Sequence, residues 1–297
     1  MNSHYVAQHP RIAGLILLTI FASFAAQSQT GVKGNLIIIG GGSRGPEVMQ
    51  PIVQLAGGEK SKIVYFPMAS ALGDAPAAER IADLKNYGAA TVLHLNITRQ
   101  QADSDSIVAL LDGVTGVYFG GGDQSRLTRV LKGTRVEKRL HELYRNGAVL
   151  AGTSAGAAVM SSIMLTGDQK RPARDSSFNS IEADNIVTAE GFGFVEDVVV
   201  DQHFLIRRRN NRLVSTVLEH PTTIGIGIDE ATAIWIKPDR TFEVLGASAV
   251  VVYNATSSRV ERDAAGHGLR ASEIQMSVLR SGSVYDLTSK KVIRLSR

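Results

Sequence analysis

From Asn35 onward, short apolar runs alternate with longer segments in which apolar residues recur at helical spacing. Five of the short runs have the length and composition of buried strands. They are "NLIIIG" (35–40), "KIVYFPM" (62–68), "ATVLHL" (90–95), "GVYFGG" (116–121) and "AVLAG" (148–152). Strands that alternate with helices form βαβ units, and right-handed crossovers between them predict a mostly parallel sheet flanked by helices.

The second half of the pattern contains more strands and one long polar stretch. A helix of small residues is expected to begin at Ser154, and the stretch 166–194 is expected to be a loop beside a functional site. A strand is predicted over 195–204 and a helix over 205–220. Four short runs then predict a meander: 222–229, 232–238, 241–246 and 248–254. Since no linker interrupts the pattern, residues 29–297 are predicted to form one α/β domain with a β-rich C-terminal extension.

The N-terminus has the layout of a secretory signal peptide. His4, His9 and Arg11 precede the apolar stretch "IAGLILLTIFASFAA", and small polar residues follow it. The apolar core is short for a membrane span, and cleavage after Ala25 or after Ser28 would satisfy the small-x-small preference. We therefore expect residues 1–28 to be a signal peptide and the protein to be exported, periplasmic or extracellular, without stable membrane association afterwards. An uncleaved anchor is the alternative.

Composition excludes several kinds of chemistry. The chain of 297 residues has no cysteine, which rules out disulfides, thiolate metal sites and a cysteine nucleophile. Its formal net charge of +4 belongs partly to the signal segment and does not argue for nucleic-acid binding. No zinc or calcium motif is present, so no metal and no cofactor are expected.

The first glycine cluster, "IIIGGGSRGPE", resembles a dinucleotide-binding fingerprint in its spacing. Gly40, Gly42 and Gly45 match G-x-G-x-x-G after a strand. The Rossmann pattern also requires an acidic residue after the next strand, where this chain has "YFPMAS". We therefore interpret the cluster as a tight turn whose backbone approaches the crevice at the strand ends.

A G-x-S-x-G motif follows the strand over 148–152. In "GTSAG", Ser154 either caps a helix or is a nucleophile raised out of the sheet by a strand-to-helix turn. A second glycine cluster, "VYFGGGDQSRL", follows another strand end. Its glycines either only form a turn or bring the N–H of Gly121 toward the nucleophile. In the second case this N–H and that of Ala155 would form the two-donor oxyanion hole that acyl transfer requires.

Histidine and acidic residues occur at other predicted strand ends. In "VVVDQHFLIRRRNNRL", His203 is followed by Arg207, Arg208, Arg209 and Arg212. Arg207 and Arg209 are two apart and do not share a helix face, which suggests an irregular loop or helix start that places charges around a crevice. Guanidinium groups there would bind carboxylates. In "GIGIDEATAIWI", either Asp229 or Glu230 could orient His203, unless the pair is a simple turn.

Together these motifs resemble those of the cyanophycinases, serine peptidases of family S51 that are related to the aspartyl dipeptidases of the peptidase E type. The resemblance rests on "GGGDQSRL", "GTSAGA", "GFGFVEDVVVDQHF", the spacing "RRRNNR" and "GIGIDEATA". It implies a flavodoxin-like or class I glutamine amidotransferase-like fold, a homodimer and no metal. It also implies that Ser154 is the nucleophile, His203 the base and Glu230 the acid.

The resemblance further implies a substrate and a pocket. The substrate would be cyanophycin, a polyaspartate with arginine linked through each β-carboxyl, hydrolysed by an exopeptidase to β-Asp-Arg dipeptides. The pocket residues carried over are Gln124, Asp201, Gln202, Arg207, Arg209 and Arg212. An aspartyl or isoaspartyl dipeptidase and a non-catalytic peptide-binding relative are the alternatives, and the segment 166–185 does not decide between them.

Overall fold

A computed structural model of the chain describes Met1 and residues 31–75, 77–171 and 178–296. Residues 31–297 form one compact unit. The predicted signal peptide lies outside the described residues apart from Met1. Within the described part of the chain, no helix is both long and apolar enough to cross a membrane.

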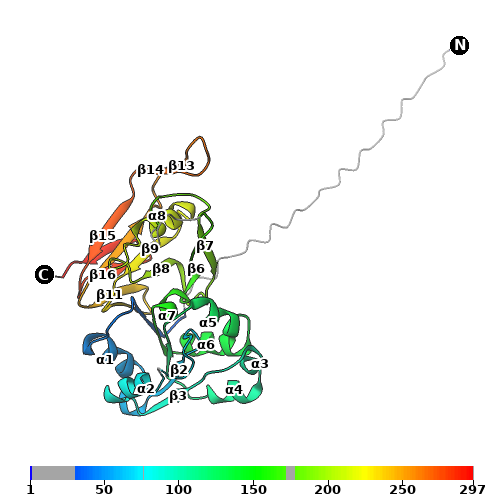
Figure 1. Cartoon of the computed structure of the whole chain (residues 1–297), viewed down its shortest axis with the longest axis vertical. Coiled ribbons are helices and arrows are strands. Elements are labelled where there is room, and N and C mark those ends of the chain that lie inside the picture. The colour runs from blue at the N-terminus through cyan, green and yellow to red at the C-terminus, as the bar shows by residue number, and fades with distance from the viewer. Residues whose placement is uncertain (2–30, 76, 172–177, 297) are drawn as a thin grey trace. The chain divides into compact units, whose positions relative to one another are not determined.

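The first five predicted strands form a parallel sheet, as the apolar runs indicated (Figure 1). Their order is β3 (Thr91–His94), β2 (Lys62–Phe66), β4 (Gly116–Phe119), β5 (Val149–Thr153) and β1 (Asn35–Ile39). In the register of the central pair, Ile39 of β1 lies opposite Thr153 of β5. The loops after β1, β4 and β5 therefore meet at one edge of the sheet, where ligand sites of such sheets lie.

Four antiparallel strands extend this sheet beyond β1 to nine strands. They are, in spatial order, β10 (Thr232–Ile236), β11 (Thr241–Gly246), β16 (Val284–Asp286) and β17 (Lys291–Arg294). We call the nine-stranded sheet sheet A.

A second sheet of six strands, sheet B, has a parallel centre and antiparallel edges. Its order is β15 (Gln275–Leu279), β12 (Val250–Asn254), β9 (Ile224–Ile228), β8 (Val195–Gln202), β6 (Ser161–Gln169) and β7 (Ile186–Glu190). A separate hairpin joins β13 (Val260–Arg262) to β14 (Leu269–Ala271). The predicted C-terminal meander is therefore wrong in its connectivity: β9 and β12 belong to sheet B, whereas β10 and β11 between them belong to sheet A.

Helices cover the outer faces of the sheets. The helices α1 (Pro46–Leu55) and α2 (Ala77–Asn86) pack on one face of sheet A through buried residues such as Ile52 and Leu84. The helix α8 (Asn210–Glu219) packs on sheet B through Leu213 and Val217. The remaining helices are α3 (Arg99–Ala102), α4 (Asp105–Leu110), α5 (Gln124–Leu131), α6 (Arg135–Arg145), α7 (Ala155–Ala158) and a 3₁₀ turn at Gly58–Lys60.

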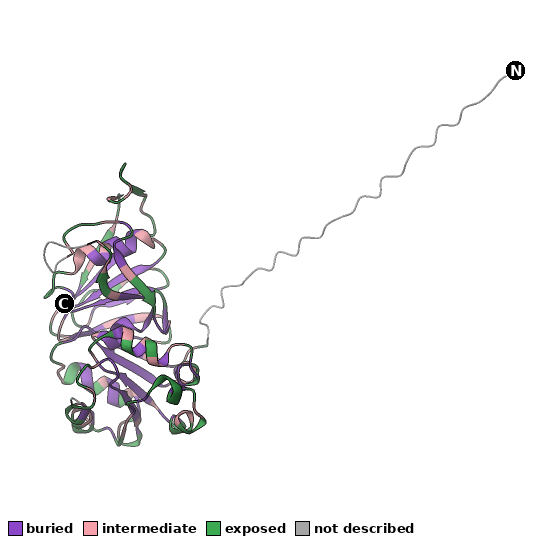
Figure 2. Ribbon diagram, turned by 45° about the vertical axis from the view of Figure 1, so that its right-hand side comes forward, coloured by how far each residue is buried: buried purple, intermediate pink, exposed green. Residues whose placement is uncertain are grey.

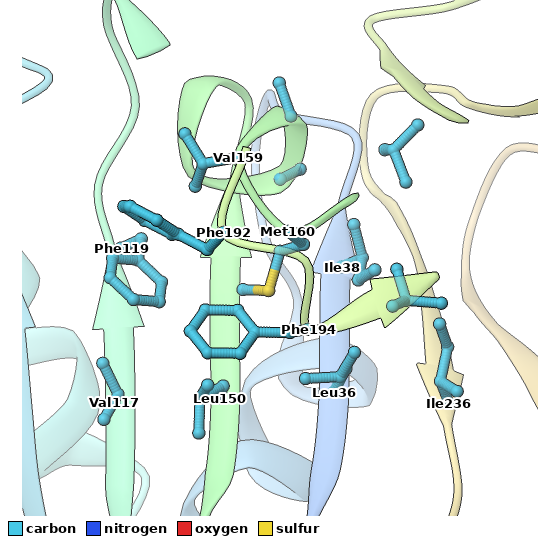
Figure 3. Packing of buried hydrophobic residues seen from close by; sticks show 14 of the residues in the cluster. Leu36, Ile38, Val117, Phe119, Leu150, Val159, Met160, Phe192, Phe194 and Ile236 are labelled. Atoms are coloured by element: carbon cyan, nitrogen blue, oxygen red, sulfur yellow. The ribbon is translucent and has the colours of Figure 1, made fainter. Parts of the chain in front are cut away.

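The largest buried cluster lies between the two sheets. It contains Leu36 and Phe119 of sheet A together with Val200 and Ile226 of sheet B. Figure 2 shows that buried residues concentrate along the strands. In Figure 3, Phe192 and Phe194 lie against β4, β5 and β1, and the ring centroid of Phe192 is 5.5 Å from that of Phe119. The two sheets therefore share one apolar core.

Three predicted boundaries differ from the structure. The helix that begins after Ser154 has four residues and is followed at once by β6. The predicted loop over 166–194 contains the end of β6, all of β7 and the buried Phe192 and Phe194. Little in the sequence pointed to them, because alternation in "NIVTAE" is weak and the phenylalanines of "GFGF" pack against segments distant in the sequence, such as β4 and α6. Residues 172–177 lie outside the described part. The helix predicted over 205–220 begins only at Asn210.

Candidate active site

Ser154, His203 and Glu230 come together at the ends of three strands. Ser154 directly follows β5, His203 directly follows β8, and Glu230 lies two residues beyond β9. The Oγ atom of Ser154 is 2.8 Å from Nε2 of His203, and Nδ1 of that imidazole is 2.5 Å from Oε1 of Glu230. A carboxylate only accepts hydrogen bonds, so the neutral imidazole carries its proton on Nδ1 and leaves Nε2 free to accept from the serine hydroxyl.

The backbone of Ser154 is held in a sparsely populated conformation. Its φ is 54° and its ψ is −111°, which costs a non-glycine residue about 1–3 kcal/mol. The flanking glycines allow the turn to close. A Cβ atom on Gly152 would lie 2.1 Å from the carbonyl oxygen of Gly156, and a Cβ on Gly156 would lie 2.3 Å from that of Phe119. The glycine spacing in "GTSAG" is therefore a packing requirement of the turn that exposes Ser154.

The two residues expected to supply oxyanion donors lie next to Ser154. A Cβ atom built on Gly121 would be 3.4 Å from Cβ and 3.9 Å from Oγ of Ser154, which places the loop after β4 against the serine. Ala155 is the first residue of α7, so its N–H has no carbonyl partner one turn earlier in that helix. Both N–H groups belong to backbone beside the hydroxyl, as an oxyanion hole requires.

The end of β1 and the glycine turn after it fix the backbone of Ser154, of His203 and of Ala231, the neighbour of Glu230. Three backbone N–H groups donate to them: Ser154 N to Ile39 O (3.0 Å), His203 N to Gly40 O (2.7 Å) and Ala231 N to Gly41 O (2.9 Å). A Cβ on Gly41, whose φ is +108°, would lie 2.3 Å from Cε1 of His203. The predicted close approach of this turn to the crevice is thus confirmed, and it joins elements of sheet A to elements of sheet B.

The environment of His203 keeps its imidazole neutral. Burial lowers the pKa of His203 below its usual value, and although Glu230 opposes this, the positive charges of Arg207 and Arg209 act in the same direction as burial. A neutral imidazole at physiological pH is the form that accepts a proton from a hydroxyl.

Asp229 and Glu230 have different surroundings. Oδ1 of the buried Asp229 accepts hydrogen bonds from the N–H groups of Leu205 and Ile206, at 3.0 Å each, and Oδ2 accepts one from Ser248. Asp229 therefore fixes the turn after His203, in the segment where a helix was predicted and α8 begins only at Asn210. Glu230 contacts the imidazole, so the alternative that the sequence left open is decided by geometry.

Two residues expected in the pocket, Asp201 and Arg212, lie in the core. Their exposed fractions are 1% and 2%, and Nε of Arg212 donates to Oδ2 of Asp201 at 2.7 Å. This ion pair connects β8 to α8. Because neither side chain reaches solvent, we correct the expectation of direct substrate contact for these two residues.

Three other expected pocket residues also have partners within the protein: Gln124 and Gln202 are buried, and Arg209 is partly buried. Nη1 of Arg209 donates to O and Oε1 of Gln202, at 2.6 Å each, and burial together with Arg212 lowers the pKa of Arg209 to about 10. Nε2 of the buried Gln124 donates to the carbonyls of Leu165 and Thr166 at the middle of β6.

Arg207 is exposed, and its charge acts on His203. In the described part of the chain, no group of three or more His, Cys, Asp or Glu residues is arranged to hold a metal ion.

Sequence reasoning missed a fourth cationic side chain, Arg44. This residue lies in the loop between β1 and α1, and its Nη1 is 3.5 Å from Oγ1 of Thr153, the neighbour of Ser154. The only signal available was its place in the loop after β1, which parallel-sheet topology brings to the same edge as Ser154.

A serine, an imidazole and a carboxylate in this order of hydrogen bonds form the arrangement that serine hydrolases use. Residues 36–244 match the model of peptidase family S51. The chain is 32% identical over 279 residues to the cyanophycinase of Nostoc sp. strain PCC 7120, with 91% of each chain covered. It is 31% identical over 278 residues to the cyanophycinase of Synechococcus elongatus, covering 91% of this chain and 84% of that one.

The fold has a solved counterpart. The crystal structure of a peptidase from an acI-B1 Actinobacterium superposes with a TM-score of 0.64 at 23% identity, covering 86% of this chain and 98% of that one. The predicted α/β fold class is thereby confirmed. The chain belongs to peptidase family S51 and is a peptidase.

Proposed function

We propose that this peptidase is a serine exopeptidase that hydrolyses cyanophycin to β-Asp-Arg dipeptides. The single observation that carries the proposal is the chain of hydrogen bonds from Ser154 through His203 to Glu230, with 2.8 Å and 2.5 Å between the bonded atoms. The similarity to cyanophycinases over 91% of the chain supports the choice of substrate.

The reaction follows from the positions of these groups. His203 Nε2 takes the hydroxyl proton as Ser154 Oγ attacks the aspartyl carbonyl, and the N–H groups of Gly121 and Ala155 stabilise the oxyanion. The imidazolium, stabilised by Glu230, then gives the proton to the leaving amine. Water, deprotonated by His203, releases the acyl group and restores the free serine.

Clearing of insoluble cyanophycin by the mature chain, residues 29–297, tests this function. The wild type is expected to release β-Asp-Arg, identified by mass, whereas Ser154→Ala is expected to release none above background. Residual activity of Ser154→Ala equal to wild type would refute the mechanism. Cleavage of Asp-Leu but not of the polymer would instead establish the dipeptidase alternative on the same site.

A second measurement addresses the non-catalytic alternative. A fluorophosphonate probe reacts with an activated serine and is expected to label the wild type but not Ser154→Ala. Absence of labelling in a folded wild type, with polymer binding retained, would support a binding protein.

We also propose that the protein is exported and forms a homodimer. The apolar segment after Arg11 supports export, and the exposed Met276 and Val278 on the edge strand β15 support self-association. N-terminal sequencing of the secreted protein is expected to begin near residue 26 or 29, and light scattering is expected to give twice the chain mass. A protein retained with its N-terminus intact, or a monomer at micromolar concentration, would contradict the respective proposal.

A further inference from the structure

The positive side chains around the crevice fall into two groups. Arg209 and Arg212 are committed to protein partners: both contact Asp201, and Arg209 also donates to Gln202. Arg44 and the exposed Arg207 have no carboxylate partner among the residues that the structure describes, and of these two only Arg44 contacts the neighbour of Ser154, Thr153. An arginine without an acid beside a nucleophile is available for an anionic group of the substrate.

The guanidinium of Arg44 is also incompletely hydrogen-bonded. Its Nε atom is buried and has no partner within the described residues, and the bond from Nη1 to Oγ1 of Thr153 is long, at 3.5 Å. A buried donor without an acceptor is costly, and native structures leave few of them unless a ligand or water completes the set. The described residues therefore leave part of the hydrogen-bonding capacity of this guanidinium unused.

The neighbours of Arg44 place it on the α1 and α2 side of the serine. Thr153, which it contacts, packs in register with Ile39 of β1. Burial raises the pKa of Tyr65 and of Tyr118, and the positive charge of Arg44 opposes that rise in both. Tyr65 in turn lies under the loop after β4, where a Cβ on Gly120 would be 2.9 Å from its hydroxyl oxygen. Arg44 thus belongs to a loop of sheet A, whereas the arginines that follow His203 belong to the segment after β8 of sheet B.

We propose that Arg44 forms a carboxylate-binding subsite beside Ser154, and that it holds the free α-carboxylate of the arginine linked to the aspartate being cleaved. This inference rests on the function proposed above, because each β-linked arginine of cyanophycin carries one free carboxylate. The planar guanidinium presents paired N–H groups that match a carboxylate in a bidentate arrangement.

The experiment compares a β-linked (Asp-Arg)₂ oligomer with the same oligomer amidated at its arginine carboxylates. For the wild type, amidation is expected to lower kcat/KM about 10- to 100-fold, the range of a charge-assisted hydrogen bond. For Arg44→Gln, kcat/KM on the free acid is expected to fall by the same factor, with little further loss on amidation. Arg44→Lys is expected to recover part of the discrimination, since it keeps the charge but not the planar pair of donors.

Arg80→Gln is the matched control. Like that of Arg44, the positive charge of Arg80 opposes the rise in the pKa of Tyr65 and Tyr118. The Nη1 atom of Arg80, however, is already paired with Oδ2 of Asp83 at 2.7 Å. This variant is expected to keep the wild-type ratio between the two oligomers. Labelling of Ser154 by a fluorophosphonate verifies that each variant is folded and has a reactive serine.

Two outcomes would overturn the subsite. In the first, Arg44→Gln reacts with the fluorophosphonate, yet its kcat/KM is still 10-fold or more lower on the amidated oligomer than on the free acid. In the second, the wild type cleaves both oligomers with equal kcat/KM. A third outcome is a wild type that reacts with the fluorophosphonate but does not cleave the oligomer with free carboxylates. This result would refute the proposed substrate, and with it the subsite for the arginine carboxylate.

Discussion

At the scale of single residues, the surroundings of His203 favour the neutral form of its imidazole, which can accept a proton. Burial lowers its pKa, the hydrogen bond to Glu230 raises it, and the charge of Arg207 lowers it. A base whose pKa is lowered stays neutral to lower pH, so the acid limb of kcat/KM is expected below pH of about 6.5, the usual pKa of histidine.

Arg207→Gln is expected to move this acid limb to higher pH. Removal of the positive charge makes protonation of His203 easier, and the movement stays below about 1 pH unit because Arg207 is exposed and screened by salt. The pH profile of kcat/KM at two salt concentrations measures it. Arg208→Gln, the adjacent exposed arginine, is the control, and an equal movement in both variants would contradict a specific effect of Arg207.

The neighbouring acids Asp229 and Glu230 are expected to separate activity from stability. Glu230→Gln should lower kcat about 10³- to 10⁴-fold, because an amide replaces the carboxylate that accepts the Nδ1 proton of His203. The free energy of unfolding should change little, because the partly exposed side chain keeps its size. Asp229→Ala should lower the free energy of unfolding by about 2–3 kcal/mol, since the N–H groups of Leu205 and Ile206 lose their acceptor. Kinetics and urea unfolding of both variants test this, and the reversed pattern would refute it.

At the scale of elements, the turn after β1 connects the parts of the site. It accepts hydrogen bonds from the backbone of Ser154, His203 and Ala231, and its glycines leave space for the imidazole and the carboxylate. Only residues without a Cβ fit there, so the first glycine cluster serves packing at the active site instead of phosphate binding.

Gly41→Ala tests this role against Gly88→Ala. Both glycines have positive φ, +108° and +98°, but a Cβ at Gly88 meets nothing within 4 Å whereas one at Gly41 lies 2.3 Å from Cε1 of His203. Each variant is expected to lose about 1–2 kcal/mol of stability from backbone strain. Gly41→Ala should in addition lose at least about 100-fold in kcat/KM, because the base is displaced. Equal activity in the two variants would show that the backbone of the turn shifts to make room for the new Cβ atom and leaves the imidazole of His203 in place.

At the scale of the whole molecule, the site depends on two sheets that share one core. Ser154 follows a strand of sheet A, whereas His203 and Glu230 follow strands of sheet B. The cluster between them includes Phe119 from one sheet and Val200 from the other. Neither sheet buries its inner face without its partner.

Unfolding is therefore expected to be cooperative across both sheets. Trp235, the single tryptophan, reports on sheet A, and peptidase activity reports on the junction of the sheets. In urea, the two signals of the mature chain should change with coincident midpoints. Loss of activity well before the change in Trp235 fluorescence would show that sheet B unfolds separately.

Local patterns in the sequence determined much of this protein. Continuous apolar runs predicted the parallel strands β1 to β5, because strands buried on both faces need apolar residues throughout. The glycine spacing around Ser154 predicted the strained turn, since no other residue allows such close backbone contacts. The strand ends after which Ser154, His203 and Glu230 occur could also be read from the same pattern.

Other features were decided only by tertiary structure. Each C-terminal strand joins sheet A or sheet B through pairing with a distant segment. The alternation of apolar and polar residues in such a strand is the same whichever sheet it joins. The burial of Asp201 and Arg212, the choice of Glu230 over Asp229, and the place of Arg44 beside Thr153 depend on contacts across up to 109 positions of sequence. Local propensity carries no information about such contacts, because their free energy arises only when the strands, loops and helices that carry them pack together.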